Sequence, residues 1–293
     1  MLEIWRALAN FSYRGNSWYR GGRFQSNSVS DAQQLLCLLL PAVSMSDFGL
    51  ARPDQTDRTA LAWLKSLAFA NDFEQVATRE DLQLEVARLR ERAGRRLTAA
   101  MVGLLRSFTI NAFDADSRPG QALLRTVNQA TLPERRVIDD LRAALAPVAA
   151  GLGDISIGSG QKKDLTGVNM LFELGWSWGV IHVTPVIEFA EAAGKQPEGL
   201  AADEPYMYFT MAALNSIADL FTAQSLRTDL LDPDQARLAR ALENRWKTTQ
   251  LYWSIIASFG GGRRWPLQDV PWRSTDEVES GYLTILVAGA ANA

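Results

Sequence analysis

The chain of 293 residues is long enough to bury a large hydrophobic core, either as one domain or as two closely packed halves. Its apolar content of 47%, charged content of 22% and formal net charge of −3 are those of an ordinary globular protein, and they do not favour binding to nucleic acid or to an anionic membrane. A single cysteine, Cys37, and a single histidine, His182, exclude an internal disulfide framework and any multi-thiolate or histidine-rich metal site within one chain.

These features predict a cytoplasmic protein without a metal ion or other cofactor. The apolar run LLCLLLPAV begins at Leu35, behind a mostly polar stretch, and ends at Pro41, which is not the pattern of a signal peptide. The apolar runs 174–187 and 205–218 are too short to span a bilayer. One cysteine is also typical of a reducing compartment.

The first distinctive segment is SYRGNSWYRGGRFQSNS, residues 12–28, which combines glycine, arginine and aromatic residues. As a binding loop, it would use Trp18 to stack and Arg20 to pair with phosphate or carboxylate groups. The alternative is a surface loop held in place by Trp18 and Phe24, and we favour this alternative.

Helices are predicted next in the chain, over residues 30–41, 57–71 and 78–108. The first opens with a capping box from Ser30 to Gln33, and Cys37 within it is expected to be a buried small hydrophobe. The third carries an apolar stripe in steps of three and four residues: Leu82, Val86, Leu89, Ala93, Leu97, Ala100 and Leu104.

Five arginines lie opposite that stripe: Arg88, Arg92, Arg95, Arg96 and Arg106. They could follow a phosphate backbone, but no aromatic residues alternate with them. A solvated helix face is therefore the favoured interpretation, and nucleic-acid binding is not expected.

A further helix is predicted from a capping box at Thr131 to Glu134. The glycine-rich stretch 151–167 then interrupts the helical pattern, and we expect a linker or an ordered loop there. This predicts an N-terminal helical half, 1–150, and a C-terminal helical half, 168–293, although one continuous domain remains an alternative.

The second half is more apolar. Residues 168–180, with Glu173 as their single charge, predict a helix that is covered on most sides, and Thr184–Pro185 predicts the start of another helix that ends at Gly194. His182 is expected to be a semi-buried structural residue, because no acid that could orient it as a general base is evident.

Residues 205–221 predict a second helix that is apolar on nearly every face. Asp219 lies on it, one turn after Asn215, and a buried acid there would need a balancing charge. Arg245 is the expected partner, ahead of Arg240.

A long helix is predicted from Asp232, where Pro233 and Gln235 complete a helix start. Its inner stripe contains Leu238, Leu242, Trp246, Thr249, Trp253 and Ile256. Glycines 260–262 end it, and a connector bracketed by Trp265-Pro266 and Pro271-Trp272 follows.

The last helix is predicted to open with a capping box at Ser274 to Glu277, so that Asp276 and Glu279 lie in its first turn. Their favoured role is to complement the helix dipole. The alternative is catalytic: Asp219, Asp276 and Glu279, or Glu173 in place of Asp219, would form a carboxylate pair in a tryptophan-lined pocket of a hydrolase or lyase. The binding candidates are Trp18, Arg20, Trp253, Trp265, Trp272 and Arg273.

The segments LFELGWSWGV, from residue 171, and WPLQDVPWRSTDEVESGY, from residue 265, resemble those of uncharacterised helical proteins from high-GC actinobacteria. The resemblance covers the second half of the chain. It brings no catalytic residues, but it implies that the chain acts with partner proteins encoded in a multi-gene cassette, such as a defence or conflict system.

Taken as a whole, the pattern predicts an all-α fold of about ten helices, packed as hairpins or a toroid-like bundle around two central apolar helices. The favoured function is a non-enzymatic interaction or regulatory subunit with a protein partner. A small-molecule ligand remains open, and no membrane association is expected.

Overall fold

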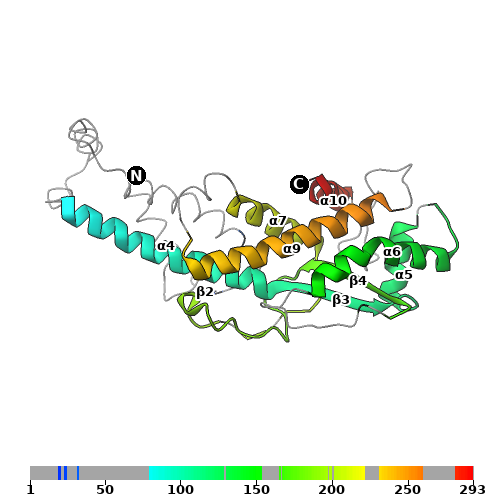
Figure 1. Ribbon diagram of the computed structural model, residues 1–293, viewed down its shortest axis with the longest axis horizontal. Helices are drawn as coiled ribbons and strands as arrows, with labels where there is room; N and C mark the ends of the chain where they lie inside the picture. Colours follow the sequence, from blue (N-terminus) through cyan, green and yellow to red (C-terminus); the bar gives the residue numbers. More distant parts are fainter. Residues whose placement is uncertain are drawn as a thin grey trace.

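The computed structural model describes residues 19–20, 23–24, 32, 79–128, 130–153, 165, 167–196, 198–199, 201–221, 231–259 and 281–292. Within these ranges there are six α-helices, and the element labels follow Figure 1. No helix in the described ranges is both long enough and apolar enough to cross a membrane.

The fold is mixed rather than all-α, because two seven-residue strands pair in its interior. Strand β3, Phe108–Asp114, lies antiparallel to β4, Met170–Trp176, with Phe108 opposite Trp176 and Asp114 opposite Met170. A shorter ladder joins β1, Tyr19–Arg20, to β2, Arg23–Phe24. The prediction of about ten helices around two central apolar helices was therefore wrong.

The main error concerns residues 168–180, which were predicted to form a helix. Six consecutive residues of β4, Leu171 to Trp176, are buried, so the segment is covered on both faces. A short, continuously apolar run is compatible with a buried strand or a buried helix, and periodicity does not separate the two. Here pairing with β3 decides the outcome. The helix predicted from Thr184 is also absent from the described residues, where only the short 3-10 turn η1, Glu191–Ala193, forms.

The long helices agree with their predicted positions. Helix α4 spans Arg79–Ser107, α7 spans Met207–Leu220 and α9 spans Pro233–Ser258. The start of α9 has the predicted capping box: the Asp232 carboxylate accepts from the Gln235 backbone N–H at 2.8 Å, and the Gln235 side chain accepts from the Asp232 N–H at 3.1 Å.

Three further helices complete the described part: α5, Arg118–Val127, α6, Glu134–Gly153, and α10, Gly281–Asn292. Helix α9 runs beside α4 along much of the molecule and also contacts α6, α7 and α10 (Figure 1). The ribbon of β3 and β4 contacts α7 and α9 through β4 and contacts α5 through β3. The strands thus come from the two predicted halves and share one core.

Tryptophan and tyrosine side chains tie these layers together by donating to backbone carbonyls. Trp176 Nε1 in β4 donates to Leu104 O in α4 at 2.8 Å, and Tyr252 Oη in α9 donates to Phe172 O in β4 at 3.1 Å. These bonds satisfy the polar atoms of large side chains that would otherwise be costly to bury. Trp246 adds a similar bond from α9 to α7.

Gly175 allows α7 to lie close to β4. A Cβ atom at this position would be 2.3 Å from Thr210 Oγ1, and the backbone φ of +157° is also one that L side chains rarely adopt. Thr210 Oγ1 accepts from the Trp176 N–H at 3.0 Å and donates to Tyr206 O at 2.8 Å. One hydroxyl therefore joins the end of β4 to the first turn of α7.

Charged residues lie deep in the core. Arg245 is wholly buried, donates from Nη1 to Ala241 O at 2.9 Å, and lies 5.4 Å from the ring centre of Phe108. Burial lowers the pKa of Arg245 to about 9. Glu173 is equally buried, and its carboxylate accepts from Asn111 Nδ2 across the ribbon at 3.0 Å.

The expected solvated arginine face of α4 is only partly correct. Arg88 and Arg95 are exposed, and Arg95 forms an ion pair with Glu91 one turn away. Arg96 and Arg106, in contrast, are buried. The C-terminal half of α4 is thus enclosed on more sides than a simple amphipathic pattern indicates.

Candidate functional site

The segment between β4 and α7, residues 177–206, is the part of the described chain with the most irregular backbone, and we call it the connecting segment (Figure 1). Arg106 fixes it to the end of α4: Nη2 donates to Thr184 O at 3.2 Å and Nε donates to Pro185 O at 3.1 Å. Burial lowers the pKa of Arg106, because the cation loses its hydration.

The two ends of the connecting segment lie together. Ser177 Oγ donates to Ala202 O at 2.6 Å, and the Ala201 N–H donates to Val180 O at 2.9 Å. Thr109 Oγ1 in β3 donates to Asp203 O at 2.9 Å. These bonds hold an irregular segment in one conformation, because they satisfy backbone groups that regular secondary structure would otherwise pair.

Four aromatic rings gather where the ends of this segment meet α7. Phe209 is buried, and the ring centres of Trp178, Tyr206 and Tyr208 lie 4.9, 5.4 and 5.9 Å from its own. Trp178 is 50% exposed and Tyr208 is 39% exposed. We call these four residues the aromatic cluster. Its buried member packs against the core, while two of its rings present apolar faces at the surface.

The connecting segment is rich in carboxylates. The connecting segment contains five acidic residues and one lysine, Lys195. Its acidic residues are Glu188, Glu191, Glu198, Asp203 and Glu204. The first three are exposed, and the last two are partly buried. The exposed Val183 and Val186 add apolar surface to the same segment.

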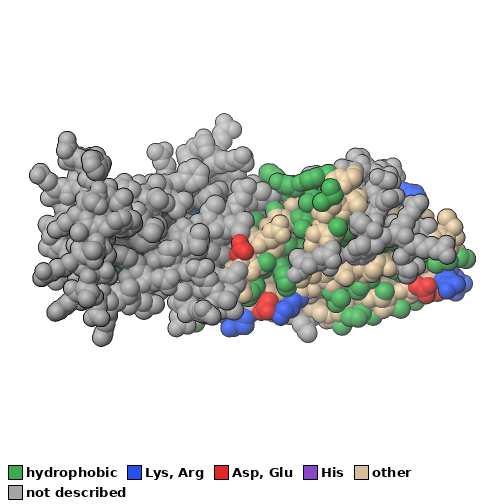
Figure 2. All heavy atoms as spheres, turned by 90° about the horizontal axis from the view of Figure 1, so that it is seen from above, with side chains coloured by type: hydrophobic (Ala, Val, Ile, Leu, Met, Phe, Trp, Pro, Cys, Tyr) green, Lys and Arg blue, Asp and Glu red, His purple; other side chains and the backbone are tan. Residues whose placement is uncertain are grey.

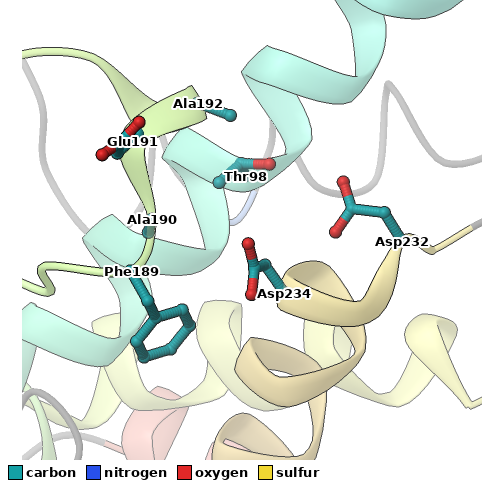
Figure 3. A pocket seen from close by; sticks show the side chains of 7 residues that line it. All are labelled: Thr98, Phe189, Ala190, Glu191, Ala192, Asp232 and Asp234. Atoms are coloured by element: carbon teal, nitrogen blue, oxygen red, sulfur yellow. The ribbon is translucent and has the colours of Figure 1, made fainter.

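A depression of about 280 Å³ lies beside the middle of the connecting segment, between η1, α4 and the start of α9 (Figure 3). Asp232 and Asp234 reach it from α9, Glu191 lies on the opposite rim, and Phe189 lines its base. The Arg237 guanidinium lies 4.1 Å from the centre of the Phe189 ring. Asp232 already caps α9, so its carboxylate has a structural role here.

A second apolar surface is formed by α10. Tyr282 and Ile285, one turn apart, are exposed, as is Leu251 on the neighbouring α9. Figure 2, viewed from the side on which α10 lies in Figure 1, shows hydrophobic side chains gathered over the described elements. No hydrogen bond or ring stacking among the described residues organises this surface as the aromatic cluster is organised.

The predicted site residues that the structure describes lie in different surroundings. Asp219 is exposed on α7, whereas Arg245 is wholly buried. Trp253 is also buried, with its ring edge-on to Tyr252 at 5.3 Å between centres, and its Nε1 has no hydrogen-bond acceptor among the described residues. Glu173, the proposed alternative to Asp219, is enclosed in the β3–β4 ribbon.

Most other candidates lie outside the described residues: Trp18, Trp265, Trp272, Arg273, Asp276 and Glu279. The same holds for Cys37, for most of the predicted helices at 30–41 and 57–71 and of the stretch 151–167, and for the capping box from Ser274 to Glu277. The backbone of Arg20 is described as part of β1. The carboxylate pair of the enzymatic alternative therefore stays a prediction.

The sequence analysis did not identify Trp178, Tyr206 or Tyr208 as site residues. All three lie in stretches that were predicted to be apolar helices, so their rings were assigned to the core. The sequence Trp176-Ser177-Trp178 provided no signal, because its spacing would place both tryptophans on one face of a strand. They differ because β4 ends at Trp176: Trp176 is buried and Trp178 is half-exposed. His182, predicted to be semi-buried, is exposed.

Within the described ranges, no group of three or more histidine, cysteine, aspartate and glutamate residues is placed to hold a metal ion. The aromatic cluster combines partly exposed aromatic side chains with a backbone held by hydrogen bonds.

The comparisons with known proteins give one match. The family model described as SCO2524-like matches residues 1–68 and 60–292. This family is uncharacterised and takes its name from a Streptomyces protein. Neither a curated protein nor a solved structure matches the chain. Because the two matched ranges together cover almost every residue, the chain belongs to the SCO2524-like family.

Proposed function

We propose that the chain is an interaction subunit of a multi-protein bacterial system and that it binds a partner protein through the aromatic cluster. The observation that carries this proposal is the exposure of Trp178 and Tyr208 on a packed aromatic base. Tryptophan and tyrosine are enriched among the residues that dominate binding energy at protein interfaces.

The geometry favours binding because little has to be ordered when a partner arrives. Trp178 packs on Phe209, and the backbone of Tyr206 is held by its N–H bond to Trp176 O at 3.0 Å. Covering the exposed parts of Trp178 and Tyr208 would remove about 200 Å² of largely apolar surface from water. At about 25 cal/mol per Å², this contributes about 5 kcal/mol before the cost of association is subtracted.

Site-specific photo-crosslinking in cells that naturally express the chain tests the proposal. A photoreactive phenylalanine analogue at position 208 should crosslink to one discrete partner. The same analogue in place of Val168, which is 79% exposed and belongs to no cluster, is the matched control. A third position, Ile285, which is 69% exposed, tests the α10 surface.

The double variant Trp178→Ala/Tyr208→Ala separates binding from folding. Both side chains are partly exposed, so we expect its melting temperature to fall by only a few degrees. With the crosslinker moved to Val183 on the same segment, the double variant should lose the partner band. A partner band that persists in the double variant, or that arises only from Ile285, would contradict the proposal.

A further inference from the structure

We infer that two copies of this chain associate through helix α10, with the two α10 helices packed antiparallel across a two-fold axis. This association is separate from the proposed function, because it uses another surface and another partner. Three features of α10 support it: its uncharged sequence, the side of the helix that is exposed, and the order of large and small residues along that side.

Helix α10 is uncharged on every side. Its sequence, GYLTILVAGAAN, contains no acidic or basic residue over Gly281–Asn292. Leu283, Val287 and Ala290 are buried in the core, and α10 contacts α7 and α9. A helix that is hydrophobic all round is normally covered on all sides. In this chain, however, Tyr282 is 55% exposed and Ile285 is 69% exposed.

The exposed residues of α10 lie on one continuous face. Tyr282, Ile285, Leu286 and Gly289 have the spacing i, i+3, i+4 and i+7, which places them on the same side of a helix. Three of them are exposed, and Leu286 is partly buried. We call these four residues the α10 face. Figure 2 shows hydrophobic side chains at the surface on the side of the molecule where α10 lies.

The α10 face is complementary in shape to itself. Its largest side chain, Tyr282, lies at one end, and Gly289, which has no side chain, lies at the other. Two such helices can pack antiparallel about an axis between Ile285 and Leu286. Tyr282 of each copy then lies over Gly289 of the other, and Ile285 lies against Leu286. Because a two-fold contact repeats every pairing, each favourable pair occurs twice.

The charge of the chain also favours a second copy as the occupant. The uncharged α10 face brings no like charges together, and a net charge of −3 causes only weak repulsion between two copies. An anionic lipid surface would instead be attracted by basic residues, which α10 lacks.

The size of the α10 face indicates that the association is weak and reversible. Pairing two such faces would bury roughly 350 Å² per copy, or about 700 Å² in total. Stable, specific interfaces bury about 1,200–2,000 Å². We therefore expect a dissociation constant of about 10–100 µM rather than a permanent dimer.

Sedimentation velocity of the full chain between about 2 and 200 µM measures the association. Ile285→Glu and Ile285→Lys each place like charges beside the two-fold axis, so each variant should associate at least about tenfold more weakly than wild type. An equimolar mixture of the two variants should recover an affinity within about threefold of wild type, because opposite charges then face each other. The matched controls are Val168→Glu and Val168→Lys, at a 79% exposed position outside the α10 face, and they should leave the association unchanged.

Cysteine substitutions test the antiparallel packing. With the native cysteine removed by Cys37→Ser, a chain carrying Tyr282→Cys and a chain carrying Gly289→Cys should form a disulfide with each other under mild oxidation. Each should form much less disulfide with itself, because only the mixed pair brings the two positions together. A Cβ at Gly289 would lie 3.3 Å from Met211 Cε, the flexible end of a side chain, so cysteine can be accommodated. Circular dichroism confirms that each variant is folded.

Three results would overturn the inference: a chain that stays monomeric up to about 200 µM, a mixture of the charge variants that associates no better than either alone, or disulfides that form within each cysteine variant rather than between the two. A monomeric chain whose position 285 crosslinks to a different protein would assign the α10 face to that protein and would also overturn it. The proposed function is tested at position 208, so the two can fail separately.

Discussion

Substitution of Gly175 by alanine should destabilise the fold more than its single added carbon suggests. The new Cβ would lie 2.3 Å from Thr210 Oγ1, so Thr210 would have to rotate and give up its bonds to Trp176 and Tyr206. Leaving the buried Trp176 N–H without an acceptor costs about 1–3 kcal/mol. The φ of +157° adds about 1–3 kcal/mol of backbone strain for a non-glycine residue.

The expected loss is thus about 4 kcal/mol, and at about 2 °C per kcal/mol for a chain of this size the melting temperature should fall by about 8 °C. Thermal and urea unfolding measure it. Gly153→Ala is the matched control, because a Cβ there meets nothing within 4 Å. Thr210→Ala in the Gly175→Ala background should recover the steric part of the loss. These contacts predict that Gly175→Ala melts about 8 °C below Gly153→Ala. A difference of less than about 1 °C between the two melting temperatures would refute the reasoning.

Three further predictions concern the core. Arg245→Ala should cost about 3 kcal/mol in urea unfolding through lost packing, whereas Arg88→Ala on the exposed face should cost less than about 0.5 kcal/mol. Burial lowers the pKa of Arg245 to about 9, well below its ordinary value, so the folded chain gains stability relative to the unfolded chain as the pH rises above about 9. The difference in stability between wild type and Arg245→Ala should therefore widen there, and a constant difference would argue against a desolvated cation. Gln235→Ala removes the capping box and the bonds to α4 and should lower stability by about 2 kcal/mol, with Asp234→Asn as the exposed control. Gly120→Ala would place a Cβ 2.3 Å from a backbone carbonyl and should lower the melting temperature by more than 5 °C, which is about 2 kcal/mol or more; an unchanged melting curve would contradict the close approach.

The elements that the sequence predicted correctly are those with long-period patterns or explicit end signals. Helix α4 showed an apolar stripe over about six turns, and α9 combined such a stripe with the helix start at Asp232. Helix α7 was predicted from its length and apolar content alone. In each case, the helix predicted from the local sequence is also the conformation in which the segment packs in the folded chain.

Strands β3 and β4 were missed for a physical reason. They are adjacent in space but are separated in sequence by α5, α6 and the stretch after α6, so their pairing is a non-local property. Each strand is buried on most positions, and neither shows the strict alternation of a half-buried strand. The partnership of Asn111 with Glu173 could not be predicted without the register of the ribbon.

The candidate site could not be predicted from local sequence either. Trp178 and Tyr208 belong to apolar stretches, and composition assigns such residues to the core. Their exposure follows from where β4 ends and where α7 begins, which depends on Gly175 and Thr210. The acidic character of residues 177–206, in contrast, is evident from the sequence.

The buried arginines suggest how the core positions the proposed binding surface. A buried cation costs free energy unless hydrogen bonds compensate for its lost hydration, and Arg106 recovers part of that cost from the carbonyls of Thr184 and Pro185. A methionine of similar volume would fill the same space but would donate no hydrogen bond. Arg106 therefore fixes the backbone of an irregular segment through hydrogen bonds that an apolar side chain could not donate. Because that segment begins beside Trp178 and ends at Tyr206, the position of the aromatic cluster depends on an ionised side chain in the interior.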